Sequence, residues 1–222
     1  MNSNSSFSTW ENTEYDSLMI KEKIELDLKK NIIKEPSNSI LEKLDEYDKK
    51  MSNPIHNLEL NCFFECIIYF FARMYNVDTI SFYFIITLLY KSYFYNDYYF
   101  ILRPLTHVII ILIITLSTKF FFGRKRPELK TNVKRLFNCR NSENNCSMPS
   151  GDSMQAANFA ILILFYFGNF IGFFFVPFVM FARVYYFCHY IFDTVIGALM
   201  GFIISYSLIF ELDLLFSYFK IL

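Results

Sequence analysis

The sequence lacks several features that would assign a protein to a class at once. Lysine plus arginine and aspartate plus glutamate number 21 each, so the net charge is zero and says nothing about partners. We expect no nucleic acid among them. The first 58 residues contain no apolar stretch that could serve as a secretory signal. Histidine is limited to three residues, and no His, Cys and Asp cluster has the spacing of a metal site. We therefore expect neither a metal nor another cofactor.

Hydrophobic residues, in contrast, are abundant. They make up 54% of the chain, with 28 Phe and 16 Tyr, and the mean hydropathy is +0.29. Most charged residues lie outside the long apolar runs, which is typical of membrane proteins. We expect an all-α fold, an integral membrane bundle of about six transmembrane helices. Residues 1–58 would form a polar, partly helical cytosolic extension, residues 59–212 the membrane domain, and residues 213–222 a short tail.

Six apolar segments follow the extension, and a membrane-spanning helix needs roughly 20 apolar residues. Residues 104–122, 154–168, 170–187 and 191–210 meet or approach that length. Residues 62–75 and 79–100 are weaker because charged or polar side chains interrupt them. In the first of these, Glu65 and Arg73 fall on one helical face, and we interpret them as a tolerated pair or as snorkelling ends.

Within the extension, Ser39 to Glu42 matches a capping box and predicts a short helix. Four apolar residues share one face of that helix: Ile40, Leu44, Tyr47 and Met51. A less regular helix is expected over residues 15–34. Two interpretations stay open. The amphipathic helix docks on the membrane or on the protein's own loops, or, as we favour, the extension is solvated and does no catalytic work.

Three short motifs lie where hydrophobic runs meet polar chain. Residues 119–127, KFFFGRKRP, end one run with the cations Lys119, Arg124, Lys125 and Arg126. Residues 149–152, PSGD, have the small residues and the carboxylate of a helix start. Residues 183–193, RVYYFCHYIFD, place His189 four residues before Asp193. Because consecutive spans cross the membrane in opposite directions, all three motifs are expected to meet on one face of the bundle.

The third motif suits transfer of a phosphoryl group. His189 and Asp193 would share a helix face, so the carboxylate can accept one ring N–H and fix the tautomer. The other ring nitrogen is then free to attack phosphorus. Five further residues would hold the phosphoryl oxygens at a helix start or by fixed positive charge: Lys119, Arg126, Arg183, the Ser150 hydroxyl and the Gly151 N–H.

The joint spacing of the motifs resembles that of a known family. The order is Lys119, six residues, Arg126-Pro127, then Pro149-Ser150-Gly151, then Arg183, His189 and Asp193. This order is similar to the tripartite signature of the type 2 phosphatidic acid phosphatase superfamily. These are integral membrane lipid phosphatases related to vanadium haloperoxidases. The resemblance covers residues 60–212. It implies metal-independent dephosphorylation of a lipid phosphate or diphosphate at the membrane surface, through a phosphohistidine at His189.

Two positions depart from the family pattern. Ala182 stands where Ser is common, a minor change, and Asp152 stands where the family usually has a His that protonates the leaving oxygen. A bound phosphate dianion would favour the protonated carboxyl, so Asp152 could still be the general acid. Otherwise acid catalysis is weakened, and the protein is a weak enzyme or a lipid-phosphate-binding relative. We favour the active enzyme because the nucleophile, its Asp and the three cations are intact.

Asp152 also bears on the substrate. When a lipid monophosphate is cleaved, the leaving group is an alkoxide, whose conjugate acid has a pKa comparable to the roughly 15.7 of water. When a diphosphate is cleaved, the leaving group is a phosphate with a second pKa of roughly 6. The alkoxide therefore depends far more on receiving a proton. Diphosphate lipids are therefore less demanding substrates. The short stretch of residues 128–148 also resembles the polyisoprenoid (presqualene or farnesyl) diphosphate phosphatase branch. A phosphotransferase, in which an alcohol resolves the phosphohistidine, is the remaining alternative.

The cysteines bear on the compartment. With six spans and a cytosolic extension, the loop that holds Cys139 and Cys146 would face the lumen, where disulfides persist. We therefore expect a disulfide between these two cysteines. The active site would lie on the lumenal side of the endoplasmic reticulum or another endomembrane, with the bilayer and a lipid phosphate as partners.

Overall fold

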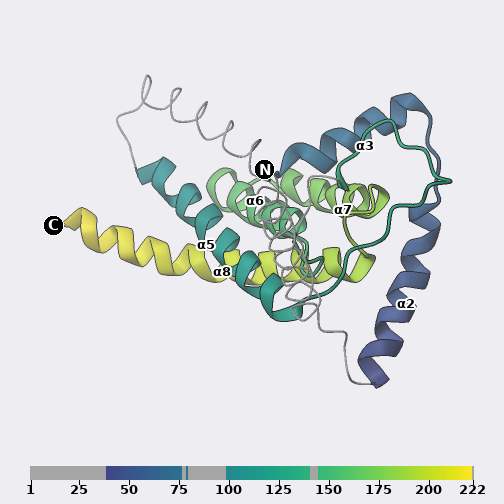
Figure 1. The fold of residues 1–222 in the computed structure, drawn as a ribbon. Helices are drawn as coiled ribbons and strands as arrows, with labels where there is room; N and C mark the ends of the chain where they lie inside the picture. Colours follow the sequence, from purple (N-terminus) through teal and green to yellow (C-terminus); the bar gives the residue numbers. More distant parts are fainter. Residues whose placement is uncertain (1–38, 77–78, 80–98, 141–144, 222) are drawn as a thin grey trace, which may run out of the picture.

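The computed structural model of the protein describes residues 39–76, 79, 99–140 and 145–221. Within them the regular elements are six α-helices (Figure 1). They are α2 (Ser39–His56), α3 (Cys62–Met74), α5 (Tyr99–Phe122), α6 (Gly151–Phe167), α7 (Ile171–Tyr185) and α8 (Ile191–Ile221). The prediction of an all-α fold is confirmed. The helix expected over residues 15–34 and most of the apolar segment 79–100 lie outside the described residues.

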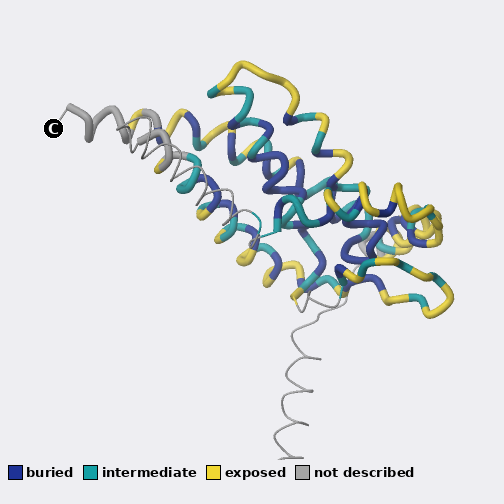
Figure 2. The backbone as a smooth tube through the Cα atoms, turned by 90° about the horizontal axis from the view of Figure 1, so that it is seen from above, coloured by how far each residue is buried: buried dark blue, intermediate teal, exposed yellow. Residues whose placement is uncertain are grey.

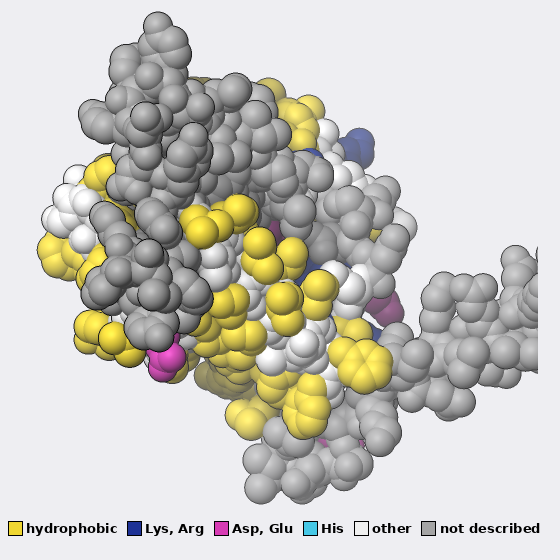
Figure 3. Space-filling view, turned by 90° about the vertical axis from the view of Figure 1, so that its left-hand side faces the viewer, with side chains coloured by type: hydrophobic (Ala, Val, Ile, Leu, Met, Phe, Trp, Pro, Cys, Tyr) yellow, Lys and Arg dark blue, Asp and Glu magenta, His cyan; other side chains and the backbone are white. Residues whose placement is uncertain are grey.

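Five of the helices, α3 and α5 to α8, pack together into one bundle. Two segments in the described chain are long and apolar enough to cross a membrane, Pro104–Phe122 in α5 and Ile191–Leu212 in α8, and α7 is a shorter apolar helix. Large apolar side chains point outward from them, among them Phe120 (76% exposed), Phe174 (70%) and Ile203 (66%). Hydrophobic side chains also dominate the described part of the face in Figure 3. Such a surface suits a lipid environment. α8 continues to Ile221, through the residues expected to form a short tail.

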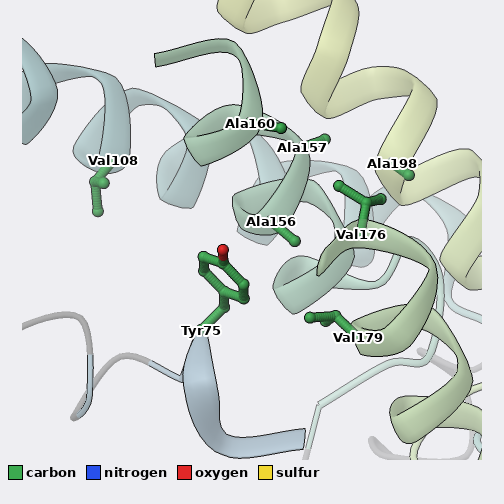
Figure 4. Packing of buried hydrophobic residues seen from close by; sticks show 8 residues of the cluster. All are labelled: Tyr75, Val108, Ala156, Ala157, Ala160, Val176, Val179 and Ala198. Atoms are coloured by element: carbon green, nitrogen blue, oxygen red, sulfur yellow. The ribbon is translucent and has the colours of Figure 1, made fainter. Parts of the chain in front are cut away.

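The centre of the bundle is α6, which packs against α5, α7 and α8. Its small residues Ala156, Ala157 and Ala160 are fully buried and face Val176 and Val179 of α7 (Figure 4). Figure 2 shows the buried residues concentrated toward the middle of the molecule and the exposed ones along its outer faces. Small side chains let helix backbones approach closely, which is how helices associate in a membrane.

Glycine permits the closest of these approaches, between α8 and the start of α6. A Cβ atom on Gly197 would lie 2.5 Å from the Ser150 carbonyl oxygen. A Cβ on Gly201, one helical turn later, would meet the carbonyl oxygen of Met154. The pair therefore sets the distance between the helices that carry the second and third motifs.

A polar network ties three helices together inside the bundle. The Asn158 side-chain oxygen lies 3.3 Å from Nδ1 of His107 and accepts a 2.9 Å hydrogen bond from the Ser205 hydroxyl. Asn158 also donates to Gln155, which donates in turn to the Val108 carbonyl. His107 on α5 is thus a satisfied structural residue.

Helix α2 runs across one end of the bundle, crosswise to α8 (Figure 1). Its polar side chains Asp48 and Ser52 are fully buried against that end. The apolar residues Leu44, Tyr47 and Met51 are exposed, at 47%, 57% and 42%. The favoured interpretation of a solvated extension is therefore wrong for α2. Its docking on the protein's own loops is confirmed, although polar residues make the contact.

The same end of the bundle anchors the long loop after α5. Glu65, near the start of α3, is buried and accepts a 2.7 Å hydrogen bond from the Leu136 N–H. Arg135 donates to the carbonyl oxygens of His56 and Leu58 and lies 3.7 Å over the Tyr185 ring. Glu65 thus holds a loop rather than serving only as half of an intramembrane pair.

Candidate active site

The three motifs meet at the end of the bundle that α2 covers. Arg126 Nη1 lies 3.4 Å from His189 Nε2, which joins the first motif to the third. The Ser150 N–H donates a 2.9 Å bond to the Asp193 carbonyl, which joins the second motif to the third. The expectation that the motifs share one face is confirmed. The predicted helix start is confirmed as well, since α6 begins at Gly151 and Ser150 is its N-cap.

Helix ends bring the motifs into place. Gly123, with φ 61°, follows the last residue of α5 and donates its N–H to the Lys119 carbonyl. This left-handed glycine ends the helix and turns the basic stretch toward the site. α7 ends in the same way, but the left-handed residue is Phe187, with φ 57°. The Cys188 and Phe187 N–H groups satisfy the carbonyls of Arg183 and Val184, as in a Schellman motif.

His189 lies in the loop before α8 and Asp193 in the first turn of α8, so the expectation that they share a helix face is wrong. The two side chains still lie together, with Ser147 beside them. His189 Nδ1 is 3.8 Å from Asp193 Oδ2, longer than a hydrogen bond. The Ser147 hydroxyl donates to Asp193 Oδ2 and lies 3.5 Å from His189 Nδ1. Tyr190 donates its N–H to the same carboxylate oxygen over 2.9 Å. Ser147 is a site residue that the motif analysis missed.

The His189 imidazole is neutral across the physiological range. Its exposed fraction is 1%, and burial lowers the pKa of His189 to about 3. The contact with Asp193 opposes this shift, but the nearby cations Arg126 and Lys119 add to it. A neutral ring keeps a lone pair on one nitrogen, which a nucleophile requires.

Lys119 and Arg126 share one acceptor, Asn145. Lys119 Nζ donates to Asn145 Oδ1 over 3.1 Å, and Arg126 donates to the same oxygen through Nη2. Arg126 Nε also donates to the Asn145 carbonyl over 2.7 Å. Both cations are buried, at 7% exposure each. Two oxygens of Asn145 therefore occupy a place where the cations could bind an anion. In the described parts of the chain, no three His, Cys, Asp or Glu side chains are grouped as metal ligands.

Arg183 meets the unusual carboxylate of the second motif. Its Nε lies 2.8 Å from Asp152 Oδ2, and Nη1 donates 3.2 Å to the Ala72 carbonyl of α3. The Ser150 hydroxyl accepts hydrogen bonds from the Ser153 N–H and hydroxyl, so it caps α6. Gly151 is the first residue of α6 and Asp152 the second. The ion pair of Asp152 and Arg183 therefore lies at the N-terminus of α6.

Arg124 links the site to α2. It donates to Asp193 Oδ1 over 2.5 Å, to Asp48 over 2.7 Å and to Asp45 over 2.9 Å. From its place in the sequence, Arg124 was expected only as one of the basic residues of the first motif. The signal in α2 was a polar stripe, Asp45, Asp48, Ser52 and His56, spaced by three or four residues on the same helix as the apolar stripe.

The structure corrects two expectations: that the extension and the active site face opposite sides of the membrane, and that Cys139 and Cys146 form a disulfide. Because α2 contacts Arg124 and the start of α8, α2 and the site lie at the same end of the bundle, so they cannot face opposite compartments. No disulfide joins Cys139 to Cys146, two residues within the described chain, and Cys139 is buried beside Tyr186 and Cys188. Burial raises the pKa of Cys139 to about 12. The predicted disulfide is therefore wrong.

Comparison with known proteins agrees with this geometry. The family model described as the PAP2 superfamily matches residues 100–211, half of the chain. Among curated proteins the sequence has no match. A structure of the first transmembrane PAP2-type phosphatidylglycerolphosphate phosphatase from Bacillus subtilis is similar, with 17% identity and a TM-score of 0.63 over 77% of this chain and 87% of that one. LpxE of Aquifex aeolicus is similar at 21% identity and a TM-score of 0.56, over 72% and 93%. The chain thus has the PAP2 transmembrane phosphatase fold and belongs to the PAP2 superfamily.

Proposed function

We propose that this protein is a membrane lipid phosphatase in which His189 Nε2 is the nucleophile and no metal takes part. One observation carries the proposal: the Nε2 atom of a buried, neutral imidazole lies 3.4 Å from the Arg126 guanidinium. The attacking atom and phosphorus approach to about 3–3.5 Å before transfer. Cations that hold the phosphoryl oxygens must therefore lie next to the nucleophile.

The first half-reaction forms a phosphohistidine. The phosphate of the lipid would bind Lys119, Arg126 and Arg183, displacing the oxygens of Asn145 and the carboxylate of Asp152. His189 Nε2 attacks phosphorus, and the bond from phosphorus to the leaving oxygen breaks. Asp193 stabilises the positive charge that develops on the ring, and the cations stabilise the transferring phosphoryl group.

Asp152 is the candidate for the proton transfers. As the general acid it gives its proton to the leaving oxygen. In the second half-reaction the carboxylate takes a proton from a water molecule, which attacks phosphorus and releases phosphate and His189. The leaving group of a diphosphate lipid is itself a phosphate and needs this proton least, so we propose diphosphorylated lipids as the preferred class.

One other function is supported by a particular observation, and a second shares the proposed intermediate. The carboxylate of Asp152 already neutralises Arg183 over 2.8 Å, which favours a catalytically weak protein that binds lipid phosphates. A phosphotransferase would use the same phosphohistidine but resolve it with an alcohol. Product analysis with an added alcohol distinguishes that activity from hydrolysis.

The test is phosphate release by detergent-purified protein, with mono- and diphosphorylated lipids, with and without chelator. We expect turnover that chelator does not change and that His189→Ala abolishes. Arg126→Ala should lose at least about 10²-fold in kcat/KM, because it removes a cation at the transferring group. Lys125→Ala, which changes the exposed neighbour in the same motif, is the matched control. Retained turnover in His189→Ala would overturn the assignment of the nucleophile.

A further inference from the structure

We propose that α2 is part of the catalytic apparatus and that Asp48, acting through Arg124, positions the Asp193 carboxylate for His189. Asp48 and Arg124 are positioning residues, because each acts on the reacting groups through another residue. The inference rests on the proposed function, since it assumes that the orientation of His189 matters for turnover. It assigns a catalytic task to α2, the helix of the N-terminal extension that the structure describes.

The first support is a buried chain of charges. Arg124 Nη1 lies 2.7 Å from Asp48 Oδ2 and 2.5 Å from Asp193 Oδ1, and both carboxylates are fully buried. Burial raises the pKa of Asp48 above its usual 3.8, and the bonds from the Phe192 N–H and Arg124 oppose that rise. One guanidinium thus holds two buried carboxylates in place, an arrangement that loses much of its stability when one partner is removed.

The second support is that the two carboxylate oxygens of Asp193 have different partners. Its Oδ1 is taken by Arg124, whereas Oδ2 accepts bonds from Ser147 and the Tyr190 N–H and faces His189 Nδ1. Because Arg124 occupies one oxygen, the carboxylate cannot rotate freely about its last bond. A carboxylate that is held in this way, with Ser147 beside it, favours the tautomer that carries its proton on the ring nitrogen facing the negative charge.

The third support is that α2 caps α8. The first N–H groups of a helix have no partner within the helix and need one from elsewhere. Asp48 Oδ1 accepts a 3.0 Å bond from the Phe192 N–H, and the Ser52 hydroxyl accepts a 2.9 Å bond from the Ile191 N–H. Side chains of α2 therefore define where the helix that carries Asp193 begins.

The fourth support is the contact of α2 with the histidine loop itself. His56 stacks on Phe187 at 4.8 Å between ring centroids, and its Nε2 lies 3.4 Å from the His189 carbonyl. Phe187 has the left-handed backbone that a bulky residue adopts only when its surroundings impose it. α2 thus holds the chain on both sides of the nucleophile.

The experiment compares Asp48→Asn with Glu46→Gln, a matched loss of one carboxylate on the exposed side of α2. Asn can still accept the Phe192 N–H but no longer neutralises Arg124. We expect Asp48→Asn to lower kcat about 10²-fold, the cost of a small misplacement. KM should change by less than about twofold, since no phosphate ligand is altered. In a double-mutant cycle, adding Asp48→Asn to Arg124→Gln should cost little more, because both act through one chain.

A readout without turnover keeps the proposal separate from the proposed function. The chain has three histidines, so ¹⁵N-histidine NMR spectra can be assigned by single substitutions. We expect one neutral tautomer of His189 in the wild type and in Glu46→Gln, and a mixture in Asp48→Asn. If no lipid phosphate is turned over, the proposed function fails, and the NMR comparison still decides the positioning role. Equal kcat in the two variants, independent effects of Asp48 and Arg124, or an unchanged His189 spectrum would each overturn that role.

Discussion

Arg183 Nε and Asp152 Oδ2 lie 2.8 Å apart, so the carboxylate that replaces the usual histidine of the second motif neutralises a cation of the third. In the proposed mechanism, an entering phosphate would compete with Asp152 for Arg183. Once displaced, the carboxyl would lie next to the phosphate, where its protonated form is favoured, and we propose that it then serves as the acid.

Asp152→Asn therefore separates two substrate classes. We expect it to cut hydrolysis of a lipid monophosphate by roughly 10² to 10⁴, the range for lost acid catalysis, and hydrolysis of a diphosphate much less. Asp152→His should restore or raise monophosphate activity and move the pH optimum upward, since a carboxyl must be protonated to work. Initial rates on matched lipids, with Glu128→Gln as an exposed control, measure this. If both rates and the pH optimum are unchanged, Asp152 is only a structural partner of Arg183.

Asn145 is expected to set substrate affinity, because its oxygens occupy Lys119 and Arg126 in the free protein. Asn145→Asp would replace a neutral acceptor by an anion that binds both cations in charge-assisted hydrogen bonds. We expect KM to rise about tenfold or more, with a smaller change in kcat. Asn138→Asp, in the same loop and exposed, controls for added negative charge. The same KM in both variants would contradict this role of Asn145.

Gly197→Ala is expected to disturb both stability and activity. The new Cβ would lie 2.5 Å from the Ser150 carbonyl, so α8 must move away from the start of α6. Overpacking of this kind costs about 1–3 kcal/mol. Thermal unfolding in detergent should show a lower midpoint, and kcat should fall because Ser150 and Asp193 separate. Leu199→Ala, at a half-exposed site of the same helix, should change kcat little. A wild-type midpoint for Gly197→Ala would show that the helices can adjust.

His56 makes the stability of the protein depend on pH. Burial lowers the pKa of His56 from 6.5 to about 4. Between these values the unfolded chain binds a proton that the folded protein does not, so the stability falls as the pH falls through that window. At pH 5 the loss is about 2 kcal/mol. His56→Gln should therefore lose less of its unfolding midpoint between pH 7.5 and pH 5 than the wild type. An identical loss in both proteins would contradict the shift.

Much of the site was predictable from the chain because its residues form three motifs at helix ends. Each motif is a local feature: a hydrophobic run that ends at Gly123, a Ser-Gly helix start, and an i, i+4 pair that follows a helix end. Alternating spans bring the three to one face. Local spacing could not reveal Ser147 or Asn145, which reach the site from the loop between two motifs. Their positions depend on how that loop packs, as do those of Cys139 and Cys146, which were expected to form a disulfide and do not.

The sequence by itself determined the helical membrane bundle, the family and the set of groups suited to phosphoryl transfer, since apolar run lengths and motif spacing are local properties. Only the tertiary structure decided what α2 does. Its sequence has a polar stripe and an apolar stripe, and hydropathy favours burying the apolar one. The unpaired N–H groups of α8 and the charge of Arg124 needed partners instead, and Asp48 and Ser52 supply them from far away in the chain. Such long-range pairing of buried polar groups has no signature in local sequence, and it places α2 at the same end of the bundle as the site.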